Sequence, residues 1–187
     1  MKNKIPVIAV IGPTASGKTA LAIAMAKAIN GEVVSADSMQ VYDEVAIGTA
    51  RPLDDEMDGV THHLMGFLPL DEVYSVARYQ EDAATVFEDV FSRGKTPVMC
   101  GGTGLYIQSF IENRQLFEEQ PDPTLRSRYM EIAQNSGNEA LMERLKSIDP
   151  ASAERIHLND LHRIIRALEV YDTTGMTITQ QAELSHA

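Results

Sequence analysis

The sequence contains a glycine-rich segment that can bind a chain of phosphate groups. Residues 12–19 read Gly-Pro-Thr-Ala-Ser-Gly-Lys-Thr and fit the pattern G-x-x-x-x-G-K-[ST] at every fixed position. In this pattern the glycines let backbone N–H groups turn toward an anion, and the amino end of the following helix adds positive potential. We expect Lys18 to contact phosphate oxygens and the Thr19 hydroxyl to bind Mg²⁺. The expected phosphate-binding residues are Gly12, Pro13, Thr14, Ala15, Ser16, Gly17, Lys18 and Thr19. The pattern predicts a polyphosphate site without defining the reaction there.

A carboxylate follows the next apolar run of the chain. Asp37 comes directly after Val33-Val34-Ser35-Ala36, so it lies at the carboxyl end of a predicted strand. In open parallel sheets this edge is where ligands bind. A carboxylate here can take a proton from a hydroxyl or amine of an acceptor, or help to hold Mg²⁺. The alternative is that Asp37 only caps the turn that follows it. We favour a role in the reaction.

A second glycine-rich turn is expected at the same edge. Three glycines within residues 101–104 indicate either close approach of the backbone to a ligand, with the Thr103 hydroxyl presented to it, or a tight strand-to-helix turn. The sequence leaves these two alternatives open. Cys100, at the end of the preceding strand, is expected to pack rather than to act as a nucleophile. The adjacent His62 and His63 point to opposite sides of an extended segment, so we expect a structural role rather than joint binding of one metal ion.

The elements that position these residues alternate between strands and helices. Strands are expected at 6–11, 32–35 and 97–100, and helices at 18–29 and 76–92. The first strand is an unbroken apolar run, which is typical of a central strand buried on both faces. Alternating strands and helices predict an α/β fold, with a parallel sheet that contains the phosphate-binding loop (P-loop) and is flanked by helices.

The character of the chain changes after Phe110, where the remaining sequence is typical of helices. Helices are expected at about 124–134, 138–147, 151–156 and 160–173. We therefore predict a P-loop α/β core over residues 1–114 and a helical insert subdomain over 115–166. Residues 167–187 are predicted to return toward the core.

Composition excludes several classes of protein. The 187 residues contain a single cysteine, which excludes a disulfide framework and a cysteine-rich zinc site. No run of 18 apolar residues is present, so we expect no membrane partner and a cytoplasmic protein. The net charge of −11 argues against non-specific attraction to nucleic acid. Acids are concentrated in residues 30–92, whereas residues 114–166 hold 8 basic residues, mostly arginines, which can make local phosphate contacts.

Taken together, seven segments of the chain resemble the tRNA dimethylallyltransferases, also called tRNA isopentenyltransferases. They cover nearly the whole chain in the order in which that family has them. The segments are the loop at 12–19, Ser-Ala-Asp-Ser-Met-Gln-Val-Tyr at 35–42, Ile-Gly-Thr-Ala at 47–50, His-His-Leu at 62–64, Ser-Val-Ala-Arg-Tyr-Gln at 75–80, Gly-Gly-Thr-Gly-Leu-Tyr-Ile at 101–107 and His-Leu-Asn-Asp-Leu-His-Arg-Ile-Ile-Arg-Ala-Leu-Glu-Val at 157–170.

The resemblance implies transfer of a dimethylallyl group from dimethylallyl diphosphate to N6 of an adenosine next to the anticodon of tRNA. The loop would then hold the diphosphate with Mg²⁺ as cofactor. Asp37 would take a proton from the amine, and Thr103 would bind near the reacting centre. The partners implied are dimethylallyl diphosphate and the anticodon stem-loop, which the insert would bind. The residues expected to contact tRNA are Asp37, Ser38, Met39, Gln40, Thr103, Arg126, His162, Arg163 and Arg166.

Three alternatives remain open at this point. A small-molecule kinase would use the same loop and acid, although no clear metal-binding acid follows the third strand. A relative that prenylates free adenine nucleotides would not need the insert with its arginines. A non-catalytic nucleotide-binding module is the third alternative. Members of the family continue beyond the point at which this chain ends, so we expect the isolated chain to bind diphosphate weakly and to turn over slowly.

Overall fold

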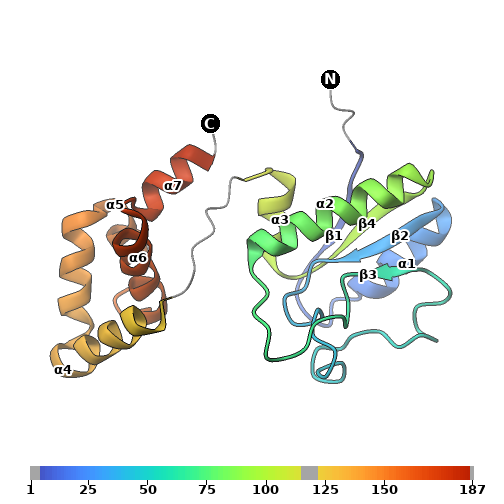
Figure 1. Cartoon of the computed structure of the whole chain (residues 1–187). Helices are drawn as coiled ribbons and strands as arrows, with labels where there is room; N and C mark the ends of the chain where they lie inside the picture. The colour runs from blue at the N-terminus through green and yellow to red at the C-terminus, as the bar shows by residue number, and fades with distance from the viewer. Residues whose placement is uncertain (1–4, 115–121, 186–187) are drawn as a thin grey trace. The chain divides into compact units, whose positions relative to one another are not determined.

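The structure is a computed structural model that describes residues 5–114 and 122–185 (Figure 1). The chain divides into two compact units, Met1–Arg114 and Gln115–Ala187. The expected start of the insert, at 115–121, lies outside the described residues. The division into core, insert and returning segment stays a prediction.

The first unit is built on a parallel sheet of four strands, as the fold class predicts. In the sheet the strand order is β1-β4-β2-β3, and every pairing is parallel. The strands are β1 (Ile8–Ile11), β2 (Gly31–Ser35), β3 (His62–His63) and β4 (Thr96–Gly101). The helices of this unit are α1 (Lys18–Ala28), α2 (Val76–Ser92) and α3 (Gly104–Ile111).

Helices cover both faces of the sheet because successive side chains of a strand point to opposite sides. In β2, Val33 packs in a cluster with Ala22 and Ala26 of α1. Its neighbour Val34 packs in a second cluster with Phe87 of α2 and Ile107 of α3. The two central strands, β4 and β2, are therefore buried on both faces. This arrangement brings the carboxyl ends of the strands to one edge, next to the amino end of α1 (Figure 1).

The predicted central position of the first strand is wrong. Within the described sheet β1 lies at an edge, pairing with β4 alone, and the Ile11 side chain is 56% exposed. The central position belongs to β4, whose Val98 and Met99 are fully buried. A run of β-branched residues indicates a strand, but the number of its neighbours depends on segments far away in the sequence.

The two ends of α2 agree with the residues that flank the helix in the sequence. The helix begins at the expected residue, directly after Ser75, whose hydroxyl accepts a hydrogen bond from the backbone N–H of Arg78 and so caps the helix. It ends before Gly94, which has a φ of +72°, a conformation that glycine adopts without strain. The segment 43–74 consists mostly of turns and short pieces and contains the short strand β3.

The second unit is helical throughout its described part. Its helices are α4 (Pro123–Ile148), α5 (Pro150–Arg155), α6 (Leu161–Thr174) and α7 (Ile178–Ser185). Gly137, with φ +78° and ψ +166°, interrupts α4 and separates the two helices expected there. Leu141, Leu145, Ile164 and Leu168 form part of the core between α4 and α6. None of the helices in the described ranges is long and apolar enough to cross a membrane.

Candidate functional site

The loop between β1 and α1 has the conformation of an anion-binding site. Ala15 and Gly17 have φ values of +61° and +81°, and Gly17 caps the amino end of α1. Alternation of left-handed and ordinary residues turns successive N–H groups toward the same point. Lys18 Nζ donates a hydrogen bond to the backbone oxygen of Pro13 at 2.6 Å, so its ammonium group lies across the loop.

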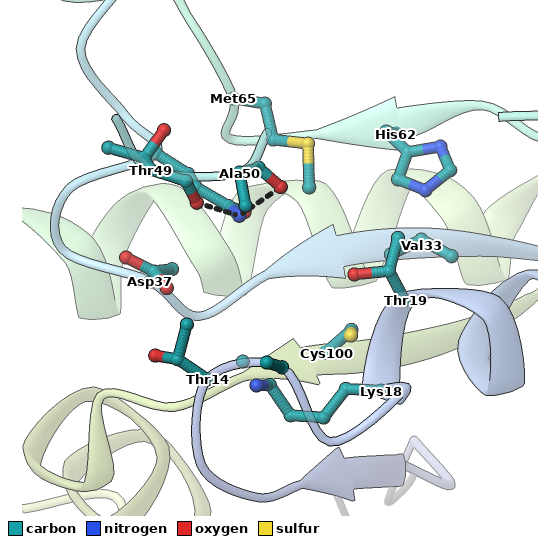
Figure 2. A pocket seen from close by; sticks show the side chains of 13 residues that line it. Thr14, Lys18, Thr19, Val33, Asp37, Thr49, Ala50, His62, Met65 and Cys100 are labelled. Atoms are coloured by element: carbon teal, nitrogen blue, oxygen red, sulfur yellow. Dashed lines mark hydrogen bonds between the residues drawn. The ribbon is translucent and has the colours of Figure 1, made fainter. Parts of the chain in front are cut away.

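The loop forms one side of a pocket at the carboxyl ends of the strands (Figure 2). The pocket has a cavity volume of about 70 Å³. Its lining brings together the phosphate-binding loop, the residue after β2, the end of β4 and the segment 40–65. The lining residues are Thr14, Ala15, Lys18, Thr19, Val33, Asp37, Gln40, Thr49, Ala50, His62, Met65, Cys100 and Gly101.

Asp37 lies in this pocket together with Lys18 (Figure 2). Its Oδ1 accepts a hydrogen bond from the backbone N–H of Met39 at 2.9 Å, so the carboxylate does stabilise the turn that follows it. In the described part of the chain Oδ2 has no hydrogen-bond partner. One oxygen therefore fixes the orientation of the carboxylate, and the other is available to a ligand. The two roles that the sequence offered for Asp37 are compatible with each other.

Thr103 binds the segment that carries Asp37. Its Oγ1 accepts a hydrogen bond from the backbone N–H of Ser38 at 2.9 Å, and its own N–H donates to the oxygen of Ala36 at 3.0 Å. Gly101 is needed for packing, because a Cβ atom there would lie 2.2 Å from the Ala36 oxygen. Gly101 is therefore explained by its close approach to the backbone that follows β2, and the two interpretations of the glycine-rich segment stay open. A direct role of Thr103 in the reaction stays a prediction.

The Gln40 side chain connects the end of β2 to the segment 45–50 through hydrogen bonds. Its Oε1 accepts a hydrogen bond from Ser35 Oγ at 3.3 Å, and its Nε2 donates to the backbone oxygen of Thr49 at 3.1 Å. The amide thus joins the end of β2 to the segment 45–50 that borders the pocket. Met39, in contrast, is largely exposed. The predicted RNA contacts of Ser38, Met39 and Gln40 stay predictions.

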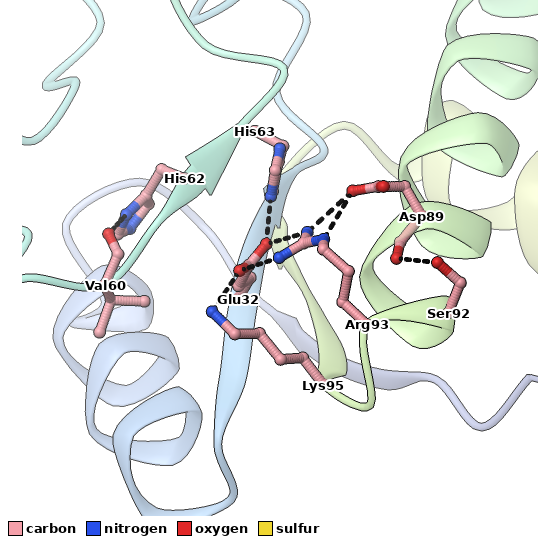
Figure 3. A network of polar contacts seen from close by, with 8 residues as sticks. All are labelled: Glu32, Val60, His62, His63, Asp89, Ser92, Arg93 and Lys95. Atoms are coloured by element: carbon pink, nitrogen blue, oxygen red, sulfur yellow. Dashed lines mark hydrogen bonds and ion pairs between the residues drawn. The ribbon is translucent and has the colours of Figure 1, made fainter.

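The two adjacent histidines face opposite sides of the sheet, as expected. His62 pairs in register with Val33 and faces the pocket, whereas His63 pairs with Val34 and contacts Glu32 (Figure 3). His62 Nδ1 lies 2.8 Å from the backbone oxygen of Val60. Its Nε2 is buried and has no partner among the described residues. Burial lowers the pKa of His62 below its usual value.

Sequence reasoning missed the location of His62 in the pocket. Only the parallel pairing of β3 with β2 decides which of two adjacent residues faces the ligand side. Within the described ranges, no group of three or more histidine, cysteine, aspartate or glutamate side chains could hold a metal ion. Cys100 packs with the α1 cluster, and burial raises its pKa, which agrees with a packing role.

A buried carboxylate holds β3 on the other side of the sheet (Figure 3). Glu32 is 2% exposed and binds both Nη atoms of Arg93 at 2.7 Å, Lys95 Nζ at 2.6 Å and His63 Nε2 at 2.7 Å. The hydrogen bonds from Arg93, followed by those from Lys95 and His63, keep the pKa of Glu32 far below its usual range despite burial. This network joins β2, β3, the end of α2 and the start of β4.

The predicted RNA-binding residues of the second unit lie on α4 and α6. His162, Arg163 and Arg166 lie within about one turn of α6, and all three are exposed. Arg126 is engaged within the protein, because its Nε and Nη2 bind the carboxylate of Glu169 at 2.8 and 3.0 Å. The Arg126 side chain is nevertheless 49% exposed. Contact of these residues with RNA stays a prediction.

A parallel sheet with the G-x-x-x-x-G-K-[ST] loop between its first strand and the following helix defines a P-loop protein. The family model for IPP transferase matches residues 40–187. The chain belongs to this family.

Relatives and solved structures agree with this assignment. The chain is 48% identical to the tRNA dimethylallyltransferase of Acetivibrio thermocellus, over 96% of this chain and 57% of that protein. It is 47% identical to the tRNA dimethylallyltransferase of Oceanobacillus iheyensis, over 95% of this chain and 56% of that protein. The tRNA isopentenylpyrophosphate transferase of Bacillus halodurans has 42% identity and a TM-score of 0.61, covering 92% of this chain and 57% of its own.

A eukaryotic dimethylallyltransferase acting on tRNA has 31% identity and a TM-score of 0.75, covering 97% of this chain and 44% of its own. The chain thus spans somewhat more than half the length of the curated relatives that it matches.

Proposed function

We propose that this chain carries the donor site and the proton acceptor of a tRNA dimethylallyltransferase. The reaction would transfer a dimethylallyl group from dimethylallyl diphosphate to N6 of an adenosine next to the anticodon. The observation that carries the proposal is that the phosphate-binding loop and Asp37 line the same pocket. The names of the relatives support it and do not favour a kinase or an enzyme that acts on free nucleotides.

The donor end of the pocket is suited to a diphosphate leaving group. As the bond between C1 of the donor and its oxygen breaks, negative charge accumulates on the diphosphate. The loop N–H groups and Lys18 can stabilise that charge without moving far, since they already surround the loop centre. The Thr19 hydroxyl is an oxygen donor of the kind that Mg²⁺ prefers, and the diphosphate would bring further oxygen ligands to the ion. When bound, the ion would supply further charge stabilisation.

The acceptor end is suited to an amine that must lose a proton. A bond forms between N6 of the adenine and C1 of the donor, diphosphate leaves, and Asp37 takes the proton from N6. The hydrogen bond from Met39 orients Oδ1, and Thr103 holds the same segment through Ser38. The adenine has to leave its stack to enter the pocket, which costs least in an unpaired loop. We include Mg²⁺, tRNA and dimethylallyl diphosphate in the proposal on these grounds.

The second unit would supply contacts to the RNA backbone. The exposed side chains of His162, Arg163 and Arg166 are close enough along α6 to contact neighbouring phosphates. Such contacts position an RNA without reading its bases. Arg126 would contribute only with the part of its side chain that Glu169 leaves accessible. In the first unit, Ser38, Met39 and Gln40 would lie near the flipped base.

The test is single-turnover prenylation of an anticodon stem-loop, with the chain in excess and product detected by mass spectrometry. We expect the mass of one dimethylallyl group on a single adenosine, formed more slowly than by the full-length Oceanobacillus iheyensis relative. Asp37→Asn should lower the rate by about 10²–10⁴, the usual contribution of a general base. Asp71→Asn, an exposed acid outside the pocket, is the matched control.

Three outcomes would contradict the proposal or part of it. Equal rates for Asp37→Asn and wild type would remove Asp37 from the reaction. Phosphoryl transfer from ATP without prenyl transfer would favour the kinase. A rate equal to that of the full-length relative would overturn the expectation that the isolated chain is slow.

A further inference from the structure

One buried atom of the pocket has no role in the function proposed above. His62 Nε2 is shielded from solvent and has no hydrogen-bond partner among the described residues. The side chain comes from β3 and lines the pocket together with Thr19 and Lys18 of the loop–helix junction (Figure 2). Buried polar atoms in proteins nearly always have a partner, because an unpaired one costs free energy. Because His62 lines the pocket, a molecule that enters the pocket can supply a partner for Nε2.

The other nitrogen of the ring decides what kind of partner Nε2 needs. Nδ1 lies 2.8 Å from the Val60 carbonyl oxygen, and a carbonyl only accepts hydrogen bonds. Nδ1 therefore carries a proton. Burial and the neighbouring His63 disfavour a second proton on the ring, so that Nε2 has a free lone pair. The atom is thus an acceptor, and it requires a donor.

The pocket itself offers few donors to this atom. Val33 and Met65, which line the same part of the pocket, have no polar side-chain hydrogen. Thr19 and Lys18 carry hydroxyl and ammonium donors, but in the described residues neither donates to Nε2, and Lys18 Nζ donates to the oxygen of Pro13. A diphosphate brings only acceptors, but Mg²⁺ keeps several bound waters when it accompanies phosphates, and these waters are strong donors. The His62 ring lies on the side of the pocket near Thr19, whereas Asp37 lies farther along it near Thr49 (Figure 2).

We propose that His62 Nε2 accepts a hydrogen bond from a water molecule bound to the Mg²⁺ ion that accompanies the diphosphate. His62 is then a positioning residue, which fixes the orientation of the metal–diphosphate complex without binding the metal directly. This inference rests on the proposed function, since it needs a diphosphate in the loop. Nitrogen is a poor ligand for Mg²⁺, which agrees with an indirect contact.

The test uses inorganic pyrophosphate and the complete chain, labelled with ¹⁵N-histidine. Long-range ¹H–¹⁵N NMR reports separately on the two ring nitrogens, and the spectrum of His62→Phe assigns the signals. We expect Mg²⁺ with pyrophosphate to shift the Nε2 signal upfield, as for a lone pair that accepts a hydrogen bond, and to leave the Nδ1 signal nearly in place. Pyrophosphate with EDTA should leave Nε2 unmoved.

Calorimetry on variants gives a second, independent measurement. His62→Phe keeps a ring of similar size and should weaken Mg²⁺-dependent binding of pyrophosphate by about tenfold, the effect of losing one hydrogen bond to a charged group. Binding without Mg²⁺ should be unchanged. His62→Gln, with an oxygen acceptor near the position of Nε2, should restore part of the affinity. His157→Phe in the second unit controls for the change of residue type.

The results separate failure of this inference from failure of the proposed function. If wild type fails to bind pyrophosphate, or Lys18→Ala binds it as well as wild type does, the diphosphate site itself is wrong. If wild type binds and the Nε2 signal stays in place, His62 has no such contact. Equal weakening of His62→Phe with and without Mg²⁺ would also overturn the inference, because the side chain would then act on the diphosphate or on the pocket shape.

Discussion

Replacing Glu32 by glutamine tests how strongly one buried carboxylate stabilises the first unit. The change keeps the size of the side chain but removes the charge that Arg93, Lys95 and His63 share. Removing one partner of a buried ion pair costs about 3–5 kcal/mol. The side chains of Arg93 and Lys95 remain 40% and 35% exposed, so water screens part of the interaction. We therefore expect the free energy of unfolding to fall by about 2–3 kcal/mol.

The assay is urea denaturation at pH 7, followed by circular dichroism, with Glu88→Gln as the matched control. Glu88 is exposed on α2, and its replacement should change the free energy of unfolding by less than about 0.5 kcal/mol. A loss for Glu32→Gln of less than about 1 kcal/mol would refute the reasoning. Such a result would mean that the cost of burying Glu32 offsets its attraction to Arg93 and its other partners.

The same carboxylate gives a pH dependence with a definite sign. The pKa of Glu32 is lower in the folded chain than in the unfolded chain, so the unfolded chain binds the proton more readily at acid pH. The stabilisation is complete above the ordinary glutamate pKa of about 4.3 and is lost as the pH falls below it. The difference in stability between wild type and Glu32→Gln should accordingly shrink when the titrations are repeated at successively lower pH between 5 and 3.

Three further changes test other parts of the structure. Gly101→Ala should destabilise the first unit by about 2 kcal/mol and lower its Tm, because the new Cβ would lie 2.2 Å from the Ala36 oxygen; an unchanged Tm would contradict this. Lys18→Ala should abolish pyrophosphate binding in calorimetry while circular dichroism stays the same. Arg126→Ala should lower the urea midpoint of the second unit, because the nearly buried Glu169 carboxylate loses its bidentate partner.

Features that depend on a short stretch of sequence could be predicted. The loop at 12–19 has a left-handed glycine, Gly17, directly before the start of α1, and the pattern of glycines, lysine and threonine encodes both. The left-handed conformation of Ala15 falls at a position that the pattern leaves unspecified. The start of α2 likewise follows from the hydroxyl of Ser75. Asp37 could be located at the strand end because Val33 and Val34 identify the strand before it.

Features that depend on pairing between distant segments could not be predicted. The edge position of β1 follows from the order of the strands in the sheet, which the residues of β1 alone do not determine. The partners of Glu32 come from 31 to 63 positions away along the chain. His62 and His63 were expected to be structural because they point to opposite sides and cannot bind one metal ion together. That argument does not show which of the two faces the pocket, and β3 has only two residues, too few for a hydrophobic pattern to show it.

The two adjacent residues of β3 contribute to different properties of the protein. His63 is bound to Glu32 on the α2 side of the sheet, and that contact stabilises the fold. His62 faces the α1 side, where its backbone pairing with Val33 directs the ring toward the phosphate-binding loop. Because β3 pairs only with β2 in the described sheet, the Glu32 network is its main side-chain attachment on that side. The buried carboxylate therefore supports the position of His62 in the pocket, although Glu32 itself lies outside that pocket.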